Sequence, residues 1–197
     1  MLNKKNNELN NLIEQTKKKE KVKKETVDIS WIIKILVMSF SISFGLSFVS
    51  EMTIPNLSLV FGIIVTLLFI GLGILFDIIG VSVTSSDEAV FHSMNSRKVK
   101  GASIAVKFKK NADKVASFCN DVIGDICGIV SGAAGTTIAA IIITTYDFNP
   151  LLVTLTVSAT IAALTIGGKA VGKSFAINKS DIILYEFAKF VSTFYKK

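Results

Sequence analysis

Residues 57–76 read LSLVFGIIVTLLFIGLGILF, and none of them carries a charge. A helix of about 20 residues rises roughly 30 Å, which is the thickness of the hydrocarbon core of a bilayer. Three further stretches of similar length are almost as apolar, at 31–50, 126–146 and 148–168. Lys34 is the only charged residue in these stretches. The sequence therefore predicts an all-α integral membrane protein with four transmembrane helices.

The polar segments suggest how the rest of the chain is divided. Residues 1–30 form a basic tail, residues 31–178 a four-span transmembrane domain, and residues 179–197 a C-terminal amphipathic helix. Residues 86–116 form an amphipathic segment between the second and third spans. We expect the spans at about 31–50, 57–83, 118–146 and 148–170.

The two amphipathic regions are expected to lie at the inner surface of the membrane. In the 86–116 segment, apolar residues recur at helical spacing on both sides of Gly101. This pattern favours two short helices on the inner leaflet, and a solvated loop is the alternative. In the 179–197 segment the apolar residues fall on one helical face, so this helix should also lie in the inner interface.

Lysine and arginine are concentrated in three segments. Residues 1–30 contain eight against five acids, residues 84–116 contain seven against three, and the chain from Lys169 onward contains six against two. The short connections near Glu51 and Asp147 contain none. The positive-inside rule then places both termini in the cytoplasm, in a multi-pass protein of the cell (inner) membrane. We expect the basic segments to contact anionic lipid headgroups and not nucleic acid, because no aromatic-interleaved basic face is present.

Glycines recur at a spacing of four in the third apolar stretch. Gly124, Gly128 and Gly132 would share one face of a helix. Glycines on one face let the backbone of another helix approach closely. The spacing therefore predicts tight helix packing along this face.

Polar residues cluster where the predicted spans meet the cytoplasm. Asp77, Thr84 and Ser86 lie at the end of the second span, and Asp121 and Asp125 share a helical face at the start of the third. If these ends pack together, they line one polar vestibule with oxygen ligands suited to a hard cation such as Mg²⁺. The alternative is that the charges only mark where each helix leaves the lipid. Neither interpretation requires covalent chemistry, so we do not expect an enzyme.

Residues 167–174, GGKAVGKS, match the phosphate-binding pattern G-x-x-x-x-G-K-[ST]. That loop requires a buried strand before it and an α/β sheet around it. Here the pattern ends a membrane span, so close packing and lysine snorkelling account for its residues.

A longer set of motifs resembles a known family. VTSSDEAVFHSMNSRKVKGASIAVKFKKNADKVASF at 83–118 is followed by IGD and later by IGGKAVGKSFA. In this order they resemble the transmembrane domain of the cyclin-M/CorC family of magnesium transporters. Thr84, Ser86 and Asp87 fall on a Ser-x-Ser-Glu-like element, and Gly101 with Ala102 on a Gly-Ala pair. Residues 111–114, Asn-Ala-Asp-Lys, fall on an Asn-Pro-Asp-Arg turn without its proline.

The resemblance implies divalent-cation (Mg²⁺) transport or export through the cytoplasm-facing vestibule, by a homodimer. Thr84, Ser86 and Asp125 would supply oxygen ligands, and Asp121 would contribute to the field. The family's last acidic ligand aligns with Lys169, whose ammonium would repel Mg²⁺ or occlude the site. The usual C-terminal regulatory domains have no counterpart here, so we expect a divergent member. The alternative is a non-transporting membrane protein of the same fold that acts as a partner- or lipid-binding regulatory module.

Overall fold

The computed structural model describes residues 29–53 and 58–194, and this part of the chain is entirely helical in its regular structure. The predicted fold class is confirmed. Four helical stretches are long and apolar enough to cross a membrane. They are α2 (Ile29–Thr53), α3 (Leu59–Ser85), the continuous helical run Ala112–Tyr146, and α8 (Pro150–Asn178).

The chain divides into two units, Met1–Leu36 and Val37–Lys197, and α2 begins in the first. This helix is mainly apolar and carries a row of aromatic rings. Phe44 stacks on Phe40 and on Phe48, with ring centroids 6.2 and 6.5 Å apart. Residues four apart lie on the same face of a helix, so these rings form a continuous apolar stripe.

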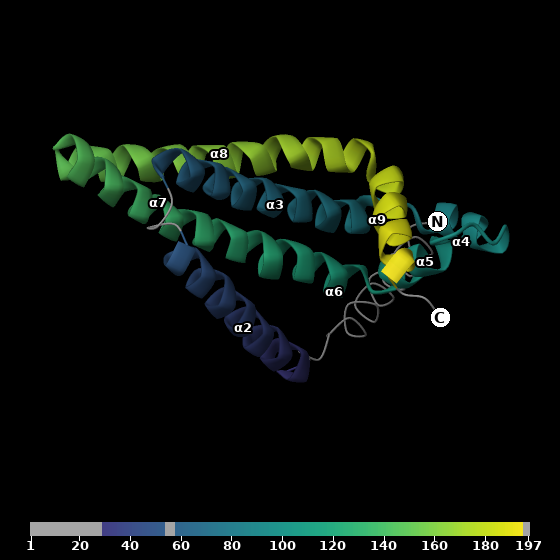
Figure 1. The fold of residues 1–197 in the computed structure, drawn as a ribbon. Coiled ribbons are helices and arrows are strands. Elements are labelled where there is room, and N and C mark those ends of the chain that lie inside the picture. Colours follow the sequence, from purple (N-terminus) through teal and green to yellow (C-terminus); the bar gives the residue numbers. More distant parts are fainter. Residues whose placement is uncertain (1–28, 54–57, 195–197) are drawn as a thin grey trace, which may run out of the picture. The chain divides into compact units, whose positions relative to one another are not determined.

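Three long helices form the membrane bundle of the second unit. In Figure 1, α3, α7 (Asp125–Tyr146) and α8 lie side by side, and each packs against the other two. A sharp turn joins α7 to α8, in which Asp147 adopts a left-handed backbone with φ of 52°. Asn149 then caps α8, because its side chain accepts the backbone N–H groups of Leu151 and Leu152.

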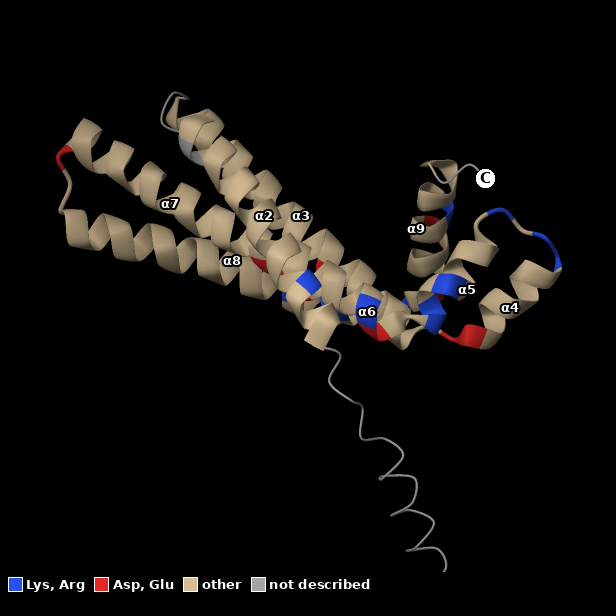
Figure 2. Ribbon diagram, turned by 90° about the horizontal axis from the view of Figure 1, so that it is seen from below, with Lys and Arg blue, Asp and Glu red and all other residues tan. Residues whose placement is uncertain are grey.

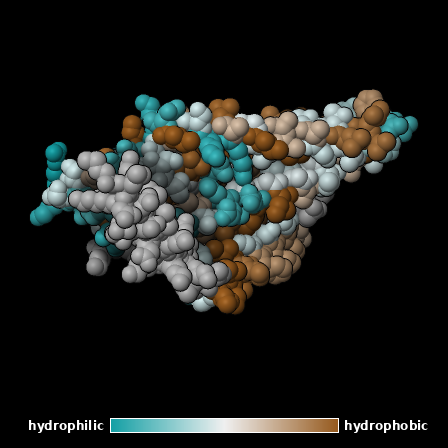
Figure 3. Space-filling model, turned by 180° about the vertical axis from the view of Figure 1, so that it is seen from behind, coloured by the Kyte–Doolittle hydropathy of each residue, from teal (hydrophilic) through white to brown (hydrophobic). Residues whose placement is uncertain are grey.

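Four shorter helices form a second layer, which we call the platform. It consists of α4 (Glu88–Ser96), α5 (Ala102–Lys110), α6 (Ala112–Ser117) and α9 (Ser180–Phe194). The platform surrounds the C-terminal end of α3, and α9 runs across this end of the bundle (Figure 1). The space-filling view shows hydrophilic residues concentrated at the platform, whereas the rest of the bundle is mainly brown to white (Figure 3).

The platform has its own hydrophobic core. Phe91, Ala105, Leu184 and Ala188 are fully buried in it, together with Val83 of α3. The apolar faces of α4 and α5 were expected to rest on a leaflet, but most of their side chains pack into this core. An amphipathic helix buries its apolar face both in a protein core and at a lipid surface. Apolar periodicity alone therefore does not distinguish the two environments.

Gly101 lets α5 lie directly against α9. Its backbone has φ of +88°, a conformation that side chains other than glycine rarely adopt. A Cβ atom there would lie 2.8 Å from the Cα atom of Lys189 on α9. The glycine expected to separate the two amphipathic helices therefore also permits the close contact of α5 with the C-terminal helix.

The predicted packing face at Gly124, Gly128 and Gly132 is used only in part within the described chain. A Cβ atom at Gly128 or Gly132 would meet no other atom within 4 Å, so these two glycines are not close-packing positions within the described chain. Gly124, in the turn before α7, does lie close to another helix, because the carbonyl oxygen of Gly73 on α3 is 3.6 Å from the position of a Cβ atom. The face of α7 that carries Gly128 and Gly132 points away from α3 and α8, and the four-residue spacing could not reveal that.

Other glycines lie at close helix contacts, among them Gly135 of α7, where a Cβ atom would clash with Ile161, and two glycines of α8. A Cβ atom at Gly168 would clash with Ile74 of α3, and one at Gly172 would lie 2.8 Å from Cγ1 of Ile78. These glycines therefore allow α8 to pack closely on α3.

Candidate functional site

Three charged side chains from three different helices meet near the platform end of the bundle. The Lys169 ammonium on α8 lies 3.2 Å from Oδ1 of Asp125 on α7 and 3.7 Å from Oδ1 of Asp77 on α3. The Asp77 and Lys169 side chains are 16% and 24% exposed, whereas that of Asp125 is 64% exposed. We call these three residues the ion triad. Figure 2 shows acidic and basic residues gathered toward this end, while the α7–α8 turn at the far end is coloured red for an acidic residue.

Close approach of α3 and α7 brings the triad together. A Cβ atom at Gly73 would lie 3.3 Å from the carbonyl oxygen of Gly124 and 3.1 Å from Cβ of Cys127. Asp77 follows Gly73 by four residues, so both lie on the α3 face that meets α7. Asp125 follows Gly124 directly. The Lys169 ammonium completes the cluster, 3.6 Å from the position of a Cβ atom on Gly124.

A π-helical turn precedes α7 beside the triad. Residues Phe118–Gly124 form the turn η2, and the backbone N–H of Asp125 donates to the carbonyl of Asn120, five residues earlier. Such turns are rare and frequently occur at functional sites. The Oδ1 atom of Asn120 is buried, and no hydrogen-bond donor within the described residues reaches it. This oxygen lies against Gly80 of α3, where an added Cβ atom would clash with it.

The predicted ligands Thr84 and Ser86 lie away from the triad. The Thr84 hydroxyl donates to the carbonyl of Val81, and the buried Ser86 hydroxyl donates to that of Val83. Seven residues separate Asp77 from Thr84, which is about 10 Å along the axis of α3. The four proposed oxygen ligands are therefore spread over two places in the described chain.

A lysine already occupies the polar end of α3. The Lys109 ammonium donates to the carbonyl oxygens of Val83 and Thr84, at 3.1 and 2.9 Å. The last carbonyls of a helix lack partners within the helix and carry its negative dipole end, so a cation is favoured there. Lys109 on α5 thus fixes the platform to the end of α3.

The remaining predicted residue, Asp121, is exposed on η2. Within the described residues there is no group of three or more His, Cys, Asp or Glu side chains placed to hold a metal ion. The triad contributes two carboxylates, and the third charged member is a cation. Asp77 and Asn120 were not among the predicted ligands, although the sequence shows both near the ends of predicted spans.

The phosphate-binding pattern at 167–174 forms no loop. All eight of its residues lie within the continuous helix α8. Its backbone N–H groups are therefore engaged in the helix and cannot cradle a phosphate. Gly168 and Gly172 serve helix packing, and Lys169 serves the ion triad.

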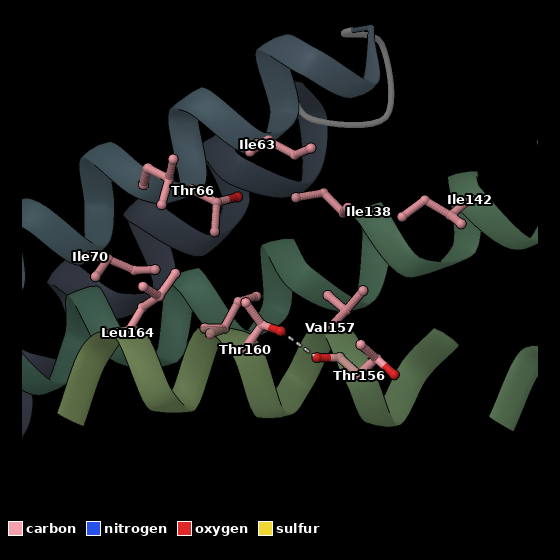
Figure 4. A pocket seen from close by; sticks show the side chains of 11 residues that line it. Ile63, Thr66, Ile70, Ile138, Ile142, Thr156, Val157, Thr160 and Leu164 are labelled. Carbon is pink, nitrogen blue, oxygen red and sulfur yellow. Dashed lines mark hydrogen bonds between the residues drawn. The ribbon is translucent and has the colours of Figure 1, made fainter. Parts of the chain in front are cut away.

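An apolar cavity of about 220 Å³ lies farther from the platform, between α3, α7 and α8 (Figure 4). It is lined mainly by aliphatic side chains, including Ile63, Ile70 and Leu164, and by three threonines. The hydroxyls of these threonines donate to carbonyls of their own helices, as Thr160 does to Thr156. The hydroxyl hydrogens are therefore engaged within the helices, and the lining of the cavity is mainly apolar.

No protein-family model, curated protein or solved structure matches the chain. The ion triad, the π-helical turn and the platform are therefore the observations on which a function has to rest.

Proposed function

We propose that this chain is a non-transporting membrane protein of a cation-carrier-like fold, which acts as a partner- or lipid-binding module through its platform. The observation that carries the proposal is the position of the Lys169 ammonium between Asp77 and Asp125. A tethered cation takes the place that a divalent ion would need. The family resemblance of the motifs remains part of the proposal and supplies the expected fold.

Electrostatics support this interpretation. Two unit charges about 4 Å apart interact by roughly 4 kcal/mol at an effective dielectric of 20. An ammonium that is paired with both carboxylates therefore lowers their attraction for Mg²⁺ and repels the ion directly. A charge near membrane depth is costly unless it is paired, so the triad also stabilises the bundle.

The proposal includes a topology. The lysine-rich platform faces the cytoplasm, and the α7–α8 turn faces outward, because Lys and Arg residues are retained on the inner side. The protein then lies in the cell (inner) membrane with its platform at the inner leaflet, and it performs no covalent chemistry.

Mg²⁺ transport is the second candidate, and two observations favour it. Asp125 is largely exposed, and the buried Oδ1 of Asn120 has no donor within the described residues. If Lys169 swung away, these oxygens and Asp77 would form a ligand set for a hard cation. Lys169 would then be a gate.

A flux measurement separates the two candidates. The protein is reconstituted into liposomes that contain a Mg²⁺-sensitive dye, and Mg²⁺ entry is compared with that into empty liposomes. We expect wild type to match empty liposomes. Wild-type entry that exceeds this background and disappears in Asp125→Ala would overturn the proposal in favour of gated transport.

A further inference from the structure

We infer that the exposed side of α9, together with the lysines around the α8–α9 bend, forms a binding surface for anionic phospholipid. The inference uses the proposed inward orientation of the platform, but it does not depend on the ion triad. Its partner is the lipid leaflet at that end of the bundle.

The position of α9 supplies the first argument. It begins at Ser180, directly after α8 ends at Asn178, so its start is held at the end of a membrane-crossing helix. Figure 1 shows that α9 then turns across the end of the bundle instead of continuing along α8. A helix held in this way lies close to the level of the lipid headgroups.

Exposed apolar side chains supply the second argument. Leu184 and Ala188 fill the platform core, whereas Ile182, Phe190 and Phe194 are 60%, 62% and 76% exposed. The Phe190 and Phe194 rings form an edge-to-face pair with centroids 5.1 Å apart. Helices that lie in a membrane interface bury such aromatic groups at the boundary between headgroups and acyl chains.

The apolar surface continues onto α8. Phe175 and Ile177, in the last turn of this helix, are 54% and 52% exposed. They belong to a helix that is apolar enough to cross a membrane. The exposed apolar residues of α9 therefore begin within a few residues of the end of this span. Their position favours the lipid around the span as their partner too.

The charges nearby are complementary to an anionic surface. Asp181 accepts the backbone N–H of Asp87, and Glu186 pairs with Lys189, so the two acids of α9 are engaged within the protein. Lys173 and Lys179 are exposed, and neither forms an ion pair within the described residues. A lysine near the membrane surface is attracted to anionic lipid, with roughly a fivefold preference for each.

Fluorescence quenching by brominated lipid tests this inference. The single tryptophan is removed by Trp31→Phe, and Phe194→Trp places a probe on the exposed side of α9. The protein is reconstituted into vesicles that contain equal fractions of brominated phosphatidylglycerol or brominated phosphatidylcholine. We expect quenching by both lipids, and clearly stronger quenching by the anionic one at low salt.

Two double variants locate the preference. Lys173→Gln with Lys179→Gln should remove it and leave quenching by phosphatidylcholine unchanged. Lys107→Gln with Lys110→Gln, which removes equal charge from exposed positions of α5, should retain it. Equal quenching by the two lipids in the parent protein would overturn the selectivity. Absence of quenching by either lipid would overturn the contact, and an accompanying concentration-dependent blue shift would assign the surface to a second copy of the chain.

Discussion

The Lys169 ammonium lies 3.2 Å from the Asp125 carboxylate and thereby joins α8 to α7. The same ammonium reaches Asp77 of α3 at 3.7 Å, so one side chain neutralises acids on both other helices of the bundle. This arrangement makes Lys169 a structural residue of the bundle, whatever else the site does.

Removing the Lys169 charge should destabilise the protein. Lys169→Met leaves the largely buried Asp77 carboxylate without its cation. We expect a loss of about 2 kcal/mol, below the usual cost of breaking a buried pair because Asp125 is exposed to solvent. Thermal unfolding in detergent should show a lower Tm. The double variant Lys169→Met/Asp77→Asn should recover part of the loss, and Lys173→Met should have little effect. A Tm unchanged in Lys169→Met would contradict the pairing.

The same substitution should destabilise the protein at Gly172 and have little effect on stability at Gly128. Gly172→Leu forces a large side chain against Ile78 of α3 and should cost roughly 1–3 kcal/mol. Gly128→Leu projects into open space within the chain and should be tolerated. The two variants are compared by thermal unfolding in detergent. A larger loss in Gly128→Leu would indicate that another helix or a second copy covers that face.

Lys109 should hold the platform on the bundle. Lys109→Met removes the donor to the carbonyls of Val83 and Thr84 and should cost about 1–2 kcal/mol. Hydrogen exchange should become faster in α5 and in the last turn of α3. Lys110→Met, next to it but exposed, is the matched control. Equal exchange in both variants would mean that the ammonium does not fix the two elements.

The topology can be checked by cysteine labelling of intact cells. Cys119 and Cys127 are buried and are first replaced by alanine. A membrane-impermeant reagent should then label a cysteine at the exposed Thr145, near the α7–α8 turn, and should spare one at Ser103 on the platform. Labelling only at Ser103 would invert the proposed orientation.

The sequence was sufficient to predict the helices but not how they face one another. Uncharged runs of bilayer length determine α3 and α8, because backbone polar groups in lipid must be satisfied within a helix. The sequence also shows that the positively charged Lys169 stands where the resembled family has an acidic ligand. The pairing of Lys169 with Asp77 was not visible there, because it depends on how α3 is rotated against α8.

The same limit explains the other differences. The row at Gly124, Gly128 and Gly132 indicated a packing face, but only the assembled bundle shows that two of these glycines face away from α3 and α8. The π-helical turn at Asn120 inserts one residue into the helical repeat, which shifts the face predicted from regular spacing. Lys109 was one of several lysines in a basic segment, and nothing in its neighbourhood distinguished it.

Isothermal titration with Mg²⁺ tests the central claim most directly, namely that Lys169 occupies the place of a divalent cation. We expect wild type to bind weakly. Lys169→Glu, which replaces repulsion by attraction, should bind more than about tenfold tighter, because one such charge contact is worth about 4 kcal/mol at an effective dielectric of 20. Lys169→Gln should lie between them, and Asp125→Ala should abolish the gain of Lys169→Glu. Tight binding by wild type that Lys169→Glu leaves unchanged would contradict the account.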